Sequence, residues 1–176
     1  MSQMVETIKK LRELTGLGVI DCKKALEKSG NDFDKALEIL KEQGVKIAEK
    51  KSERATGEGL IGSYIHSNGK IGVLVEVTCE SDFVARTEDF KELVKNLCLQ
   101  IAATSPEYIK KDDIPESVIE EKKKVYSDIE QFYREKVLFC QPFIKDDSIT
   151  IEEYVKSKIA KLGENIRVNR FTRYEI

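Results

Sequence analysis

The sequence predicts an α+β protein, in which a small helical module precedes a core made of a small antiparallel three-stranded sheet packed with helices. Three observations predict this fold class. Residues 1–45 carry apolar side chains at helical spacing, and glycines divide them into short segments. Asn68-Gly69, a strong hairpin signal, lies between two stretches with strand character. Long helical stretches and one last alternating segment follow, as in α+β proteins.

Residues 1–45 are expected to form three short helices. Gly16, Ser29-Gly30 and Gly44 follow the three helices as stops, and Asn31 or Asp32 caps the third helix. A bundle of this size has a thin core, which favours a docking module over a catalyst. The side chains expected to face inward are Val5, Ile8, Leu11 and Leu14; Cys22, Ala25 and Leu26; and Phe33, Ala36, Leu37 and Leu40.

Three apolar residues, Leu17, Val19 and Ile20, lie in the loop before the second helix and at its start. They can staple the helix or fill the core of the bundle. Alternatively, they can form an exposed apolar patch that a partner must cover. The pattern alone favours neither interpretation.

A charged and then glycine-rich stretch follows the bundle and indicates a helical continuation that frays into a linker. The expected domains are therefore a docking domain over residues 1–45, a linker over residues 46–56 and an α+β core over residues 57–176.

The core is expected to begin with a hairpin. Its second strand places Ile71, Val73, Val75, Val77 and Cys79 on one face and Leu74, Glu76 and Thr78 on the other. His66 lies near the turn as a surface residue. A helix with Phe90, Leu93, Val94, Leu97 and Ile101 inward comes next, and Pro106 ends it.

The rest of the core combines helices with one strand. An apolar stripe indicates one long helix or two abutting helices, and it consists of Val118, Val125, Ile129, Phe132 and Val137. Thr150 and Glu153 form a capping box for a helix that ends at Gly163. The alternation of Ile166, Val168 and Tyr174 predicts a third strand.

Composition argues against several classes of protein. No apolar run approaches the roughly 20 residues needed to cross a bilayer, and the N-terminus lacks the apolar core of a signal peptide, so we expect a cytoplasmic protein without membrane contact. The net charge is −2 and neither half is strongly basic, which argues for a protein partner and against direct nucleic-acid binding.

The sequence offers little chemistry of its own. Its single histidine and four widely spaced cysteines predict buried free thiols and no metal site. No phosphate-binding, dinucleotide-binding or zinc-protease motif occurs in it. Cys79 lies on the buried strand face, so its thiol is expected to be inert. We therefore expect no enzyme, no catalytic residue and no cofactor.

A polar break follows the second strand, at Ser81-Asp82-Phe83-Val84. Ser81 is a good N-cap, and Asp82 complements the dipole of a helix that starts there. In one continuous helix Phe83 would extend the apolar stripe of Phe90, and periodicity alone slightly favours this. A fresh start capped by Thr87 would instead leave Phe83 on a protruding turn, as an anchor for a protein partner.

Four segments, in order and at compatible spacing, resemble the signatures of the elongation factor Ts family. "TGLGVIDCKKAL" resembles its N-terminal signature, and "YIHSNGKIGVLVEVTCESDFVART" resembles its core signature with the Thr-Asp-Phe-Val motif. "QPFIKD" and "GENIRVNRFTRYE" match its C-terminal blocks. This chain has Ser81 where the family usually has threonine, and Val19 and Ile20 where methionines are common.

The resemblance implies a guanine-nucleotide exchange factor for elongation factor Tu, with an N-terminal three-helix domain similar to ubiquitin-associated domains. It implies that Ser81, Asp82, Phe83 and Val84 disturb the magnesium and phosphate site of the GTPase domain, with Phe83 as a wedge between its helices. Val19, Ile20 and Lys23 would be the docking patch. The chain resembles a short form of the family, with residues 116–139 shortened. Short members can act as dimers, which raises the hypothesis of a homodimer.

Overall fold

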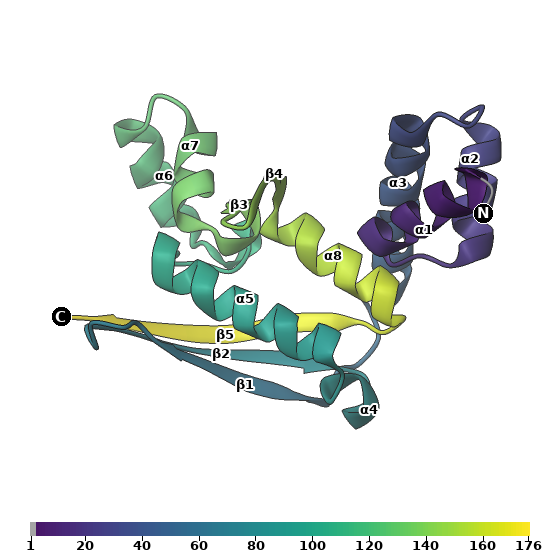
Figure 1. The fold of residues 1–176 in the computed structure, drawn as a ribbon. Helices are drawn as coiled ribbons and strands as arrows, with labels where there is room; N and C mark the ends of the chain where they lie inside the picture. Colours follow the sequence, from purple (N-terminus) through teal and green to yellow (C-terminus); the bar gives the residue numbers. More distant parts are fainter. Residues whose placement is uncertain (1–2) are drawn as a thin grey trace.

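In the computed structural model, which describes residues 3–176, a three-helix bundle leads through its long third helix into a sheet covered by helices (Figure 1). The predicted α+β class is confirmed, and the N-terminal helices are consistent with a ubiquitin-associated-like domain. The elements are α1 Gln3–Thr15, α2 Val19–Lys28, α3 Phe33–Lys51, β1 Glu58–Ile65, β2 Ile71–Cys79, α4 Asp82–Ala85, α5 Glu88–Thr104, η1 Lys111–Asp113, α6 Glu116–Val125, α7 Ile129–Lys136, η2 Leu138–Cys140, β3 Pro142–Phe143, β4 Asp146–Thr150, α8 Ile151–Leu162 and β5 Ile166–Glu175.

The bundle of α1, α2 and α3 has a small core of its own. Its buried apolar residues are Leu11, Leu17, Cys22, Ala25, Leu26, Ala36 and Leu40. Val5 and Leu14 were expected to face this core, but they are 52% and 63% exposed. Because three short helices enclose only the middle of α1, its ends contribute little to the core. The Asp32 side chain caps α3 by accepting a hydrogen bond from the Lys35 amide.

The prediction that Gly44 ends the third helix is wrong, because α3 continues to Lys51. Gly44 is buried, and a Cβ built on it would lie 3.6 Å from the Cβ of Ala160 in α8. The glycine therefore allows close packing of α3 against α8 and does not serve as a left-handed stop.

The three-stranded sheet has the order β1-β2-β5, and all its pairs are antiparallel. Val73, Val75, Val77 and Cys79 of β2 face α5, which covers one side of the sheet (Figure 1). His66 is exposed, as expected. Of the two turn residues only Gly69 has a positive φ. The turn is longer than two residues, because the Gly69 amide donates to the His66 carbonyl, which places Asn68 inside the turn and Gly69 at its end.

Two separate helices, α6 and α7, carry the apolar stripe expected in residues 118–137. The Asp128 side chain caps α7 afresh by accepting a hydrogen bond from the Glu130 amide. Phe132 and Val137 are buried in a small cluster with Ile114, whereas Val125 is 73% exposed and does not belong to the stripe. The new start at Asp128 changes the helical register, which turns Val125 out of the cluster.

The last helix has the predicted ends. Thr150 and Glu153 form the capping box of α8, and Gly163 ends it with a φ of 75°. The two-stranded sheet of β3 and β4 was not expected. Within residues 3–176, no helix combines the length and apolarity that a membrane crossing requires.

Candidate functional site

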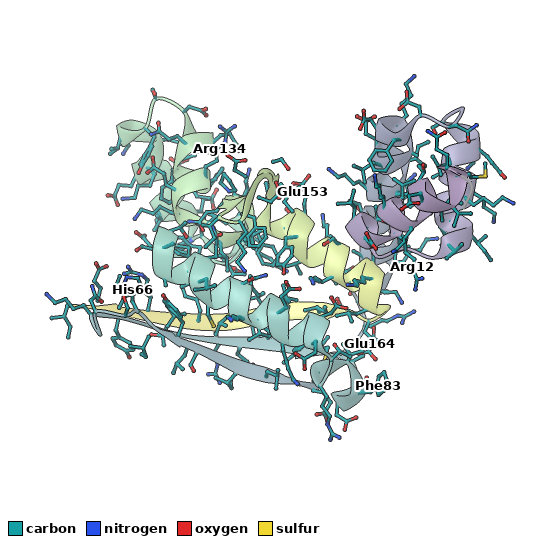
Figure 2. All side chains as sticks on the ribbon, viewed as in Figure 1. Arg12, His66, Phe83, Arg134, Glu153 and Glu164 are labelled. Atoms are coloured by element: carbon teal, nitrogen blue, oxygen red, sulfur yellow. The ribbon has the colours of Figure 1, made fainter. Side chains whose placement is uncertain are left out.

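Phe83 is the most exposed aromatic side chain in the described part of the core, at 77%. It lies on α4, a helix of one turn that projects from the end of the sheet (Figures 1 and 2). The interpretation that Phe83 extends the buried stripe of α5 is wrong, because the chain breaks at Arg86 and Thr87. The Thr87 hydroxyl donates to the Val84 carbonyl at 2.8 Å and accepts from the Phe90 amide at 3.3 Å, so that it closes α4 and starts α5.

The short helix is held firmly on its inner side while Phe83 points outward. Val84 and Ala85 are buried, each 5% exposed, against the core of the sheet and α5. The Ser81 hydroxyl caps the helix by accepting a hydrogen bond from the Val84 amide at 3.3 Å. The backbone beneath the aromatic ring is therefore fixed, and a partner that covers the ring has little backbone entropy to remove.

Glu164, which the sequence analysis did not single out, fixes the start of α4. Its carboxylate accepts hydrogen bonds from the Ser81 amide at 2.9 Å and from the Ser81 hydroxyl at 2.6 Å. In Figure 2 it lies directly beside the helix that carries Phe83. Since 83 residues separate Ser81 from Glu164, no local pattern could have indicated this contact.

Asp82 is exposed next to Phe83 and forms an ion pair with Arg86 one turn later, with 2.7 Å between the carboxylate and the guanidinium. Both side chains are more than half exposed. A pair of this kind contributes little to stability, and either charge can turn to a partner at small cost.

The second group of predicted residues lies at the start of α2. Val19 and Ile20 are 50% and 68% exposed, whereas Leu17 is buried in the bundle. The structure therefore separates the three apolar residues into one core residue and two surface residues. Lys23, one turn after Val19, is exposed and lies 3.8 Å from Glu27. We call Val19, Ile20 and Lys23 the docking patch.

The thiols of the described residues are mostly buried. Cys22, Cys79 and Cys98 are buried free thiols, and Cys140 is half-buried. Burial raises the pKa of Cys79 and of Cys98 to about 11, so both stay protonated at neutral pH. Across residues 3–176, no three histidine, cysteine or acidic side chains come together in a way that could hold a metal ion.

The chain is similar to one family of known proteins over its whole length. The family model described as "Elongation factor TS" matches residues 3–131. The elongation factor Ts of Thermotoga neapolitana is 49% identical over 193 aligned positions, which cover 100% of this chain and 98% of the relative. The elongation factor Ts of Coprothermobacter proteolyticus is 50% identical over 188 positions, which cover 96% of this chain and 95% of the relative.

A third relative, the elongation factor Ts of Moorella thermoacetica, is 45% identical over 188 positions, which cover 96% of this chain and 93% of the relative. These three relatives match this chain almost end to end, and their identities of 45–50% are high enough to show the family as well as the fold. This chain belongs to the elongation factor Ts family and is a translation elongation factor.

Proposed function

We propose that this chain is a guanine-nucleotide exchange factor in the cytoplasm, which binds elongation factor Tu carrying GDP and promotes the release of GDP. The observation that carries the proposal is the exposed Phe83 on a rigid, doubly capped turn. A large apolar ring held in water on a fixed base is unfavourable for the free protein, and a partner that buries it gains roughly 1.5–3 kcal/mol. Such residues are typical anchors of protein interfaces.

An exchange factor needs no catalytic group of its own. It accelerates nucleotide release when it binds the nucleotide-free state of its partner more tightly than the loaded state. An aromatic ring inserted between packed helices supplies that difference, because packed interfaces switch between discrete arrangements and do not deform gradually. In this proposal Phe83 inserts into the GTPase domain and shifts the groups that hold Mg²⁺ and the phosphates.

The neighbours of Phe83 have supporting roles. Ser81 and Val84 fix the orientation of α4 from its inner side. Because the ion pair of Asp82 with Arg86 is exposed, Asp82 can leave Arg86 and bind a basic group or a backbone amide in the displaced part of the GTPase domain.

The docking patch is proposed to hold the bundle on the same GTPase domain. Val19 and Ile20 present two branched apolar side chains on one turn of α2, and Lys23 adds a charge at their edge. An apolar centre with a charged rim is the usual composition of a protein interface.

The experiment is the release of a fluorescent GDP analogue from elongation factor Tu, measured with the wild-type chain, with Phe83→Ala and with Val125→Ala. Val125 is the matched control, because it is also apolar and is exposed to a similar extent, at 73% against 77% for Phe83. It lies at the end of α6, far from α4 (Figure 1). Wild type and Val125→Ala should accelerate release, whereas Phe83→Ala should lose most of the acceleration at an unchanged melting temperature.

Two other outcomes would change the conclusion. Equal acceleration by wild type and Phe83→Ala would move the mechanism away from Phe83 and towards the docking patch. No acceleration by any of the three proteins would contradict the exchange function and favour an adaptor, in which the bundle binds a partner and the core is a scaffold.

We also propose a homodimer formed through the open face of the sheet. Among residues 3–176, Figure 1 shows no helix on the side of the sheet opposite α5. Four large apolar side chains of that sheet are more than 45% exposed: Ile61, Ile65, Leu74 and Tyr174. An apolar surface of this kind is typical of a protein contact. A monomeric mass in light scattering, at concentrations that support exchange, would contradict the dimer.

A further inference from the structure

One short segment of the chain contacts both of the elements that carry the proposed binding residues. It comprises the end of α8 and the turn after it, residues 160–165, and we call it the bridging segment. In Figure 1 the end of α8 lies between the bundle and the end of the sheet from which α4 projects. Its contacts to each side are specific.

Towards the bundle, the bridging segment packs closely. Ala160 contacts the core cluster of the bundle and lies opposite Gly44 of α3. The ammonium of Lys51, at the end of α3, donates a hydrogen bond to the Gly163 carbonyl at 2.7 Å.

Lys161 makes the closest of these contacts. Its aliphatic stem lies on Gly16, so that a Cβ at residue 16 would overlap the Cβ, Cγ and Cδ atoms of Lys161. Gly16 also has a φ of 69°, so both its backbone and its surroundings require glycine. Gly16 precedes Val19, the first residue of the docking patch, by three positions.

Towards Phe83, the bridging segment makes two polar contacts. Glu164 accepts the two hydrogen bonds from Ser81 at the start of α4. The Lys161 ammonium donates to Asp89 at 2.6 Å, and Asp89 lies in the first turn of α5, directly after α4. The side chain of Lys161 therefore covers the loop before the docking patch with its stem and reaches the first turn of α5 with its charge.

A second lysine of α8 donates to the same carboxylate oxygen of Asp89. Lys158, which is almost fully buried, forms ion pairs with Asp89 at 3.2 Å and with Glu92 at 2.8 Å. If the Lys161 side chain is removed, Lys158 still holds α8 on α5 through Asp89 and Glu92, whereas the loop at Gly16 loses its contact with α8.

We propose that Lys161 is a positioning residue, which holds the docking patch in a fixed orientation relative to Phe83 so that both reach elongation factor Tu together. The inference rests on the proposed exchange function. Two contact groups on one rigid body bind as a unit, and the second contact is made at a high effective concentration. If their relative orientation varies, part of the binding energy is spent on ordering them.

The test uses the full chain with Lys161→Ala, which removes both the stem over Gly16 and the ammonium at Asp89. Lys91→Ala is the matched control, because Lys91 is an exposed lysine near the same end of α5 whose ion pair within residues 3–176 is with Glu88, three residues earlier. Lys161→Arg keeps both the stem and the charge. GDP release from elongation factor Tu should fall about five-fold with Lys161→Ala, because part of the binding energy is then spent on ordering the two contact groups. The loss should appear mainly in kcat, because both contact groups remain present.

A second measurement detects the orientation without elongation factor Tu. Spin labels at Glu38→Cys on α3 and Lys95→Cys on α5, two exposed positions outside the proposed contacts, report the distance between bundle and core. Cys140 is replaced by serine to avoid unwanted labelling, since the other three thiols are buried. The distance distribution should broaden or shift with Lys161→Ala and stay as in the wild type with Lys91→Ala and with Lys161→Arg.

The two measurements separate the inference from the proposed function. An unchanged distance distribution in Lys161→Ala would overturn the positioning role, whatever the exchange rate. A broadened distribution with full exchange activity would also overturn it, because the orientation would then not matter. If the wild type itself fails to release GDP, the exchange function is wrong, even if the distances show that Lys161 joins the bundle to the core.

Discussion

Replacement of Glu164 by alanine should loosen the turn that carries Phe83. The substitution removes the acceptor of two hydrogen bonds from Ser81, at 2.9 and 2.6 Å. A hydrogen bond to a charged group contributes roughly 1.5–3 kcal/mol when it is well shielded from water. Because Glu164 is only half-buried, water replaces part of the loss, and we expect the free energy of unfolding to fall by about 2 kcal/mol for the two bonds together.

Urea denaturation measures this change, and a double-mutant cycle with Ser81→Ala assigns it. The Ser81→Ala chain keeps the amide that donates to Glu164 but loses the hydroxyl, which also caps α4. The two substitutions should therefore be less than additive. Glu164→Gln, which keeps a carbonyl acceptor of similar size, should lie between wild type and Glu164→Ala. Under conditions where the variants remain folded, the rate of GDP release should follow the same order.

Glu121→Ala is the control, because Glu121 is an exposed glutamate on α6, far from α4 (Figure 1). The reasoning would be refuted by additive effects of the Ser81 and Glu164 substitutions, or by a Glu164→Ala chain that unfolds at the same urea concentration as Glu121→Ala.

Three further predictions concern charge, packing and thiols. Hydrogen bonds from Lys161 and Lys158 lower the pKa of Asp89. The ionised Asp89 therefore stabilises the folded protein above about pH 4, and this stabilisation is lost as the pH falls through the lowered pKa. In acid, the urea midpoint should fall more steeply for wild type than for Asp89→Asn. Gly62→Ala should destabilise the sheet by about 1–3 kcal/mol in thermal unfolding, because the new Cβ would overlap Val94 and Cys98. Under native conditions Cys140 should react with a thiol reagent well before the other three cysteines, which are buried.

The elements that local chemistry specifies could be predicted from the sequence. The capping box of α8, the stop at Gly163 and the alternation of β2 depend on neighbouring residues only, and each is present in the structure. The class of the fold followed from their order. Gly44 was misinterpreted because its role depends on Ala160, more than a hundred residues away, and Val125 because a new cap at Asp128 changed the register.

In the candidate site, too, features set by neighbouring residues could be predicted and features set by distant residues could not. Periodicity left the position of Phe83 open, since a continuous helix and a broken one differ only in whether Thr87 caps a new helix. The family resemblance pointed to Phe83 and to Val19 and Ile20, and all three are exposed in the structure. Glu164 and Lys161 went unnoticed because their partners are distant in sequence, and a charged residue near a helix end has no distinctive local pattern.

The position of α8 and β5 at the end of the chain has a consequence for synthesis. The bundle is complete at residue 51, but α8, against which α3 packs, begins only at residue 151. At ~5–20 residues per second the ribosome needs about 5–20 s to make the residues between them. The third strand of the sheet and the carboxylate that anchors Ser81 also emerge only then. A chain that has emerged only as far as α3 thus carries Val19 and Ile20 but lacks the groups that anchor the start of α4, so the two proposed contacts can be combined only after β5 has been made.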